Sequence, residues 1–150
     1  MPIAEREAEV VWEGTLARGA GELTSGSGVL DGFEVTWASR TEAPDGRTSP
    51  EELIAAAHAS CFAMALSLVL GQRDATPERI AVQARCTLDE VDGAPKIVSS
   101  RLDVDGWVSG IDQPGFDDAI EQAKALCPVS NALHGNVEIA VHAAFEGARV

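Results

Sequence analysis

Two of the three cysteines in this chain are the residues best suited to chemistry. Cys61 lies in the middle of a long apolar stretch, and Cys127 lies directly before a proline, where a predicted helix breaks. A cysteine thiolate is a strong nucleophile, and two neighbouring thiols can be oxidised to a disulfide and reduced again. The residues therefore indicate reactive or redox-active thiols. The plainer alternative is that both are inert and buried.

Cys61 needs a cation or a hydrogen-bond donor nearby, because apolar burial raises the pKa of a thiol. Arg40, at the end of a predicted strand, is the best candidate, with Arg18 and Arg47 in reserve. Each could equally be an ordinary surface charge. Cys127 needs less help, because it lies near the positive end of a short predicted helix. Local electrostatics alone would therefore make Cys127 the thiolate.

The third cysteine and the histidines indicate no separate chemistry. Cys86 shares the apolar face of an alternating strand, which is typical of a small core residue. His58 precedes Cys61 by three residues on one helical face, and His134 follows Cys127 by seven. Because there is no second close pair of ligands, zinc is disfavoured and we expect no metal.

The element that must hold Cys61 is one long helix, predicted over residues 50–70. Ser49 and Glu52 match the Ser-x-x-Glu capping box that starts many helices. Gly71 would supply the left-handed residue that ends the helix. The sequence thus places Cys61 near the helix centre, far from either end.

This helix has no face suited to water, since no charged side chain lies between Leu53 and Leu70. Its length approaches that of a membrane span. Alanine, a weak hydrophobe, supplies much of that length, and three polar residues interrupt it: His58, Ser60 and Ser67. We therefore expect a helix buried in protein rather than in a membrane.

The remaining elements are predicted to be strands and two further helices that cover the long one. Strands are predicted over 5–14, 22–25, 29–39, 80–88, 96–108 and 136–146, and helices over 114–127 and 128–133. The first strand should bury one face, and the third should deliver Arg40 at its end. The expected fold is α+β, with antiparallel sheets wrapped around long buried central helices. A dimer would bury a helix that is apolar all round, and we expect residues 1–150 to form a single domain.

Composition excludes several kinds of partner. Eleven basic and twenty-four acidic residues give a net charge of -13, which repels phosphate and anionic lipid headgroups. We therefore expect no nucleic-acid or membrane partner. The first residues lack the pattern of a secretory signal, so a cytoplasmic location is expected. Cysteines in that reducing compartment are typically free or redox-active.

Two segments resemble the signature segments of the OsmC/Ohr family of thiol-dependent hydroperoxidases. They are residues 50–62, PEELIAAAHASCF, and residues 127–133, CPVSNAL. Residues 11–14, VWEG, and 27–30, SGVL, together with the spacing of the cysteines, are similar to the OsmC branch. The resemblance spans nearly the whole chain. It implies an intertwined homodimer, a single OsmC-like domain, and reduction of organic hydroperoxides in preference to hydrogen peroxide.

The resemblance implies that Cys61 is the peroxidatic cysteine and Cys127 the resolving one, which reverses the electrostatic argument. Cys61 would become a sulfenic acid, Cys127 would condense with it to a disulfide, and a dithiol reductant, for example a lipoyl-type one, would restore both. The family's arginine and glutamate match Arg40 and Glu51. In the Ohr branch the arginine comes from an earlier loop, which would favour Arg18. No cofactor is implied.

Helix geometry restricts how Glu51 could serve Cys61. Ten residues of a straight helix rise about 15 Å, too far for one site. Either the helix is broken between the two residues, or Glu51 serves the Cys61 of the partner subunit. An apolar lining would favour alkyl or aryl peroxides. The candidates for that lining are Phe62, Met64, Trp37 and Phe33.

Two other functions stay open at this point. One is a thioesterase-like enzyme, in which a sheet wraps a long central helix, although this leaves the matched cysteines unexplained. The other is a non-catalytic dimeric protein that binds apolar small molecules and whose thiols are inert.

Overall fold

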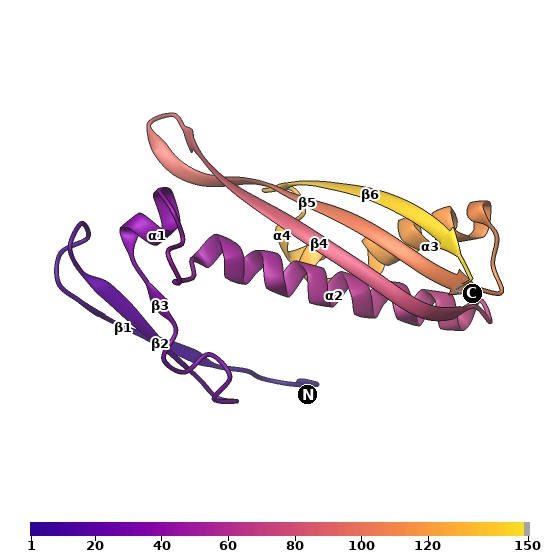
Figure 1. The fold of residues 1–150 in the computed structure, drawn as a ribbon, viewed down its shortest axis with the longest axis horizontal. Helices are drawn as coiled ribbons and strands as arrows, with labels where there is room; N and C mark the ends of the chain where they lie inside the picture. The colour runs from indigo at the N-terminus through magenta and orange to yellow at the C-terminus, as the bar shows by residue number, and fades with distance from the viewer. Residues whose placement is uncertain (149–150) are drawn as a thin grey trace. The chain divides into compact units, whose positions relative to one another are not determined.

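A computed structural model describes residues 1–148, which fall into two compact units that divide after Leu53. Figure 1 shows the elements in chain order. They are β1 (Ala8–Glu13), β2 (Ala20–Ser25), β3 (Glu34–Val35), α1 (Trp37–Thr41), α2 (Pro50–Gln72), β4 (Thr76–Val91), β5 (Ala94–Ser109), α3 (Gln113–Leu126), α4 (Pro128–Leu133) and β6 (Glu138–Gly147). The chain is of the α+β class, as predicted. Its organisation as one domain stays a prediction.

The first unit contains a three-stranded antiparallel sheet in the order β1-β2-β3. Leu23 of β2 is buried, whereas all six residues of the edge strand β1 are exposed. The prediction that the first strand buries one face is therefore wrong for a single chain. Val10, Val11 and Trp12 present apolar surface to the surroundings.

The third predicted strand, residues 29–39, is largely wrong. Only β3 pairs with β2, and the chain then enters the short helix α1. Thr36 and Ser39 explain the change, because each side chain accepts the other residue's backbone N–H at 2.9 Å in a capping box. These local bonds override the alternating apolar pattern. Arg40 consequently lies on a helix and not at the end of a strand.

The long helix α2 runs without a break. At its start, Ser49 accepts the N–H of Glu52 at 3.2 Å, but the Glu52 carboxylate accepts from the Thr48 hydroxyl at 2.8 Å, so only half of the predicted box forms. At its end, the helix continues past Gly71, and Asp74 supplies the left-handed residue with φ of 58°. The predicted end was therefore slightly too early.

One side of α2 lies in the main hydrophobic core. Phe62, Leu66 and Val69 are fully buried and pack in one cluster with residues of β5 and α3. The other side is open, since Met64 is 72% and Leu68 56% exposed. One chain therefore does not bury this helix all round. By length and composition α2 could also cross a membrane, a test that core helices of soluble proteins pass as well.

The second unit contains a three-stranded sheet in the order β4-β5-β6 (Figure 1). β4 and β5 form the predicted hairpin, whose turn residues Asp92 and Gly93 both have positive φ. β6 pairs with β5 in parallel, so the expectation of purely antiparallel sheets is wrong. The physical reason is the helical connection through α3 and α4, which is long enough to return the chain in the same direction.

Helix α3 confirms the predicted spacing. Asp112 caps its start by accepting the Gly115 N–H at 2.9 Å. Its buried face carries Phe116, Ala119, Ile120 and Ala123. Cys127 ends α3 and begins α4 in an extended conformation, because the residue before a proline avoids helical dihedrals.

Candidate active site

The structure brings Cys61 and Cys127 together, as the two-thiol interpretation requires. Their side chains are neighbours, close enough for the Cys127 thiol to raise the pKa of Cys61, and both are free thiols. Cys127 is fully buried, whereas Cys61 is partly exposed. The pair therefore offers one thiol that a small molecule can reach and a second that is shielded behind it.

Two helices fix the position of Cys127. Its N–H donates to the carbonyl of Ala123 at 2.9 Å, which is the last bond of α3. Its carbonyl accepts the N–H of Asn131 at 3.0 Å, which is the first bond of α4. Pro128, which has no N–H, starts α4 at the position where a helix tolerates it. The break between the helices thus holds the thiol in a defined backbone geometry.

Burial raises the pKa of the Cys61 thiol, and the neighbouring Cys127 raises this pKa further. A hydrogen bond from the backbone N–H of Val129 acts in the opposite direction and lowers it. Because burial is the largest of these effects, the reduced pair by itself favours the neutral thiol at Cys61. A cation is still needed to make Cys61 a thiolate near neutral pH.

Arg40 and Glu51 form the second pair of predicted site residues. The Nε and Nη2 atoms of Arg40 donate to Glu51 Oε1 at 3.0 Å and 2.8 Å. Glu51 is only 7% exposed, and its Oε2 atom is buried without a hydrogen-bond partner in residues 1–148. The carboxylate thus orients the guanidinium and keeps one oxygen available.

The two reserve arginines have different surroundings. Arg47 makes ion pairs with Glu34 at 3.3 Å and Asp45 at 3.8 Å. Arg18 is exposed in the turn between β1 and β2. Of the three candidates, Arg40 is the one bonded to the predicted glutamate.

The two pairs belong to different units and are linked along the chain by α2. Glu51 lies in the first turn of this helix and Cys61 ten residues later. Because α2 is continuous, the expectation that a break brings the two residues together is wrong. The other expectation, that Glu51 serves the Cys61 of the partner subunit, stays a prediction.

Sequence reasoning missed the contacts of His58. This residue is fully buried, with Nδ1 2.6 Å from Ser100 Oγ and Nε2 2.7 Å from Ser130 Oγ. Burial lowers the pKa of His58, which favours the neutral ring. No pattern in the sequence pairs this histidine with either serine, since they lie 42 and 72 residues away. Residues 1–148 contain no cluster of three or more metal-ligating side chains.

The predicted apolar lining loses one of its four candidates. Phe62 is fully buried in the hydrophobic core, so it cannot line an accessible site, whereas Met64 is exposed. Trp37 is partly exposed and Phe33 exposed, and both belong to the unit that carries Arg40. The lining therefore stays a prediction for Met64, Trp37 and Phe33.

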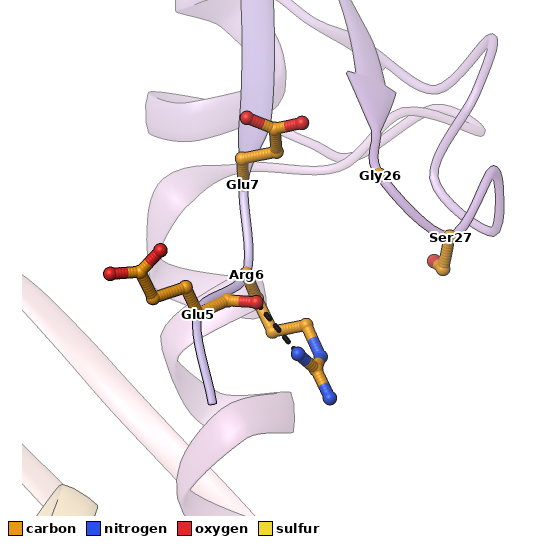
Figure 2. A pocket seen from close by; sticks show the side chains of 5 residues that line it. All are labelled: Glu5, Arg6, Glu7, Gly26 and Ser27. Atoms are coloured by element: carbon orange, nitrogen blue, oxygen red, sulfur yellow. Dashed lines mark hydrogen bonds between the residues drawn. The ribbon is translucent and has the colours of Figure 1, made fainter. Parts of the chain in front are cut away.

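An open depression of about 840 Å³ lies at the start of the first unit (Figure 2). Its lining consists of Glu5, Arg6, Glu7, Gly26 and Ser27. The Arg6 guanidinium donates to the carbonyl of Glu5 at 2.6 Å. None of the predicted site residues lines this depression, so it is a different place from the candidate active site.

Residues 43–142 match the family model described as OsmC-like protein. The chain is 42% identical over 134 residues to the peroxiredoxin OsmC of Escherichia coli K12, covering 89% of this chain and 93% of that protein. It is also similar to the crystal structure of the organic hydroperoxide resistance protein OhrB of Bacillus subtilis. That comparison gives a TM-score of 0.73 at 31% identity and covers 92% and 98% of the two chains. An organic hydroperoxide resistance protein of Elizabethkingia anophelis gives a TM-score of 0.78 at 26% identity, covering 97% and 99%.

Proposed function

This chain belongs to the OsmC family, and on that premise we propose that it is a cysteine-based peroxidase that reduces organic hydroperoxides to alcohols in oxidative-stress defence. The observation that carries the proposal is that Cys61 and Cys127, 66 residues apart in the sequence, are neighbouring free thiols in one packed cluster. Relatives named peroxiredoxin and organic hydroperoxide resistance protein support the same activity. The 42% identity to the peroxiredoxin favours the OsmC branch.

The proposed reaction has two thiol steps. The Cys61 thiolate attacks an oxygen of the hydroperoxide, the O–O bond breaks, and the alkoxide takes up a proton and leaves as the alcohol. Cys61 has then lost two electrons and is a sulfenic acid. The Cys127 sulfur attacks the Cys61 sulfur, the S–O bond breaks, and the hydroxyl leaves as water with the proton of the Cys127 thiol.

The Arg40 guanidinium is proposed to stabilise the thiolate and the leaving oxygen, and Glu51 to hold the guanidinium. Since one chain separates Glu51 and Cys61 by about 15 Å along α2, the arginine and glutamate would serve the Cys61 of the partner subunit. This arrangement requires a homodimer. The exposed apolar side of α2, with Met64 and Leu68, supplies surface that a second copy could bury.

The disulfide of Cys61 and Cys127 is proposed to be reduced by a dithiol, for example of the lipoyl type. The first thiolate of the reductant attacks one sulfur of the disulfide, and its second thiol releases the product by exchange. The protein itself needs no metal or flavin for either half of the cycle. A reducing compartment such as the cytoplasm would supply the dithiol.

The deciding experiment is a peroxidase assay with cumene hydroperoxide and dihydrolipoamide. Wild type should consume the hydroperoxide catalytically, and Cys61→Ser should show only the uncatalysed background. One equivalent of hydroperoxide added to the reduced protein should remove two titratable thiols per chain. A thioesterase-like enzyme or a binding protein with inert thiols would keep all three thiols, and that result would reject the proposal.

Apolar peroxides should be the better substrates. Met64, Trp37 and Phe33 are the remaining candidates for an apolar lining that alkyl or aryl groups could contact and hydrogen peroxide could not. Comparable turnover of hydrogen peroxide and cumene hydroperoxide would show that no such lining acts on the substrate.

A further inference from the structure

His58 bridges two elements that approach the cysteine pair from different parts of the chain. Its Nδ1 atom bonds Ser100 on β5, and its Nε2 atom bonds Ser130 on α4. All three residues are buried, with exposures of 0% for His58 and Ser100 and 5% for Ser130. Both ring nitrogens therefore have partners, and a neutral ring satisfies both by donating one hydrogen bond and accepting the other.

Helix α4 contacts α2 through two consecutive residues. The Val129 N–H donates to the Cys61 sulfur, and the Ser130 hydroxyl bonds to His58. Cys61 and His58 lie one turn apart on the same face of α2. Cys127 begins α4, so the bond between His58 and Ser130 fixes the helix that carries Cys127 against the helix that carries Cys61.

We propose that His58 is a positioning residue, which holds α4 through Ser130 so that Cys127 stays within reach of Cys61 for disulfide formation. The inference rests on the proposed function, because the step in which His58 acts is the second thiol step of the proposed reaction. In this step the Cys127 sulfur bonds to the Cys61 sulfur, the S–O bond of the sulfenic acid breaks, and water leaves. The step is fast only if the two sulfurs are held in line, because a shift of about 1 Å can slow such a reaction about a hundredfold.

The two hydrogen bonds of His58 can be removed separately. Ser130→Ala removes the bond to α4, and Ser100→Ala removes the bond to β5. Each substitution deletes one hydroxyl from a buried serine that is hydrogen-bonded to His58. The two should therefore destabilise the fold by similar amounts. Only Ser130→Ala should slow disulfide formation, by about tenfold, whereas Ser100→Ala should stay within about threefold of wild type.

Two substitutions of His58 form a second matched pair. A glutamine amide reaches about the position of Nε2, and an asparagine amide reaches about the position of Nδ1. His58→Gln can therefore keep the bond to Ser130, and His58→Asn can keep only the bond to Ser100. Disulfide formation should be nearly normal in His58→Gln and slow in His58→Asn. A purely structural role in the core would affect both variants alike.

The measurement is a single turnover with one equivalent of cumene hydroperoxide. Hydroperoxide consumption reports the first step, and mass spectrometry of the quenched protein reports the disulfide. Dimedone traps any sulfenic acid that persists. Ser130→Ala and His58→Asn should consume hydroperoxide at a rate within about threefold of wild type but accumulate the dimedone adduct. Equal disulfide rates for Ser130→Ala and Ser100→Ala would overturn the inference.

A second measurement does not depend on peroxidase activity. The equilibrium of the Cys61–Cys127 disulfide with dithiothreitol gives the effective concentration of one thiol at the other. Ser130→Ala should lower this value about tenfold, and Ser100→Ala should not. If wild type consumes no hydroperoxide but this difference is found, the proposed function fails and the positioning role stands. If wild type is active and the difference is absent, only the positioning role fails.

Discussion

Arg40 donates both of its side-chain hydrogen bonds to the same oxygen of Glu51, and the other carboxylate oxygen is buried without a partner in residues 1–148. A buried carboxylate oxygen without a partner destabilises the chain that contains it. An incoming donor would therefore find a site that is already oriented. This geometry makes Arg40 and Glu51 a unit whose function can be tested by substituting either residue.

Arg40→Met should lower kcat/KM for cumene hydroperoxide about a hundredfold or more, because it removes the charge proposed to stabilise the Cys61 thiolate. Steady-state rates with saturating dithiol measure the effect. Arg101→Met is the control, since Arg101 is an exposed residue of β5 paired with Asp103, and it should behave as wild type. If Arg18→Met shows this loss and Arg40→Met stays active, the activating cation is Arg18, in the turn after β1, and not Arg40.

A mixed dimer of a Cys61→Ser chain and a Glu51→Ala chain should have about half of the wild-type activity. In the proposed arrangement, one of its two sites combines an intact Cys61 with the intact Glu51 of the other chain. Each parent homodimer should be nearly inactive. Differently tagged chains, co-expressed and purified by both tags, give the sample. Activity no higher than that of Glu51→Ala would mean that each chain supplies its own site.

Cys127→Ser should complete one turnover and then lose activity. Its Cys61 sulfenic acid has no neighbouring thiol to condense with, so excess hydroperoxide oxidises it to sulfinic and sulfonic acids. Mass spectrometry after increasing equivalents of hydroperoxide measures these products. Cys86→Ser should show the wild-type disulfide, and formation of a Cys61–Cys86 disulfide would contradict the assignment of Cys127.

His58 should make the fold sensitive to acid. Burial lowers its pKa from the ordinary 6.5, so the unfolded chain binds a proton at a higher pH than the folded chain does. The stability that His58 contributes is fully present above pH 6.5, the ordinary pKa of histidine. It is lost as the pH falls from there through the folded-state pKa. Urea unfolding between about pH 7 and pH 5 should show a steeper loss for wild type than for His58→Gln.

Met64→Glu combined with Leu68→Glu should yield monomers of low activity. These side chains lie on the open side of α2, where two charges would prevent a second copy from packing. Analytical ultracentrifugation measures the mass, and the peroxidase assay the activity. Val91→Glu at the tip of the β4–β5 hairpin is the matched exposed control. A fully active monomer would show that the site is complete within one chain.

Local signals were enough to predict the elements that hold the cysteines. The proline after Cys127 predicts the break between α3 and α4, and the uncharged run around Cys61 predicts α2. The helix that holds Arg40 was missed, although its signal is local too, because the bonds between Thr36 and Ser39 compete with a strand-like alternation of apolar residues.

Contacts between distant parts of the chain could not be predicted in this way. The parallel pairing of β6 with β5 depends on where a helical connection returns the chain. Ser100 and Ser130 are far from His58 in the sequence, and neither lies in a pattern that specifies a histidine as its partner. Hydrophobic periodicity predicts which face of an element is buried, but it does not specify the residue on the opposite element.

Because α2 runs without a break, insertions and deletions within it change the geometry of the proposed site. Each inserted or deleted residue between Glu51 and Cys61 would rotate one end of the helix relative to the other by about 100° and shift it by about 1.5 Å. The side chains of Glu51 and Cys61 would then point in new directions relative to each other, whatever the inserted side chain was. Homologous sequences should therefore vary in residue type along this segment while keeping its length constant, and single-residue insertions there should be as damaging as loss of either residue.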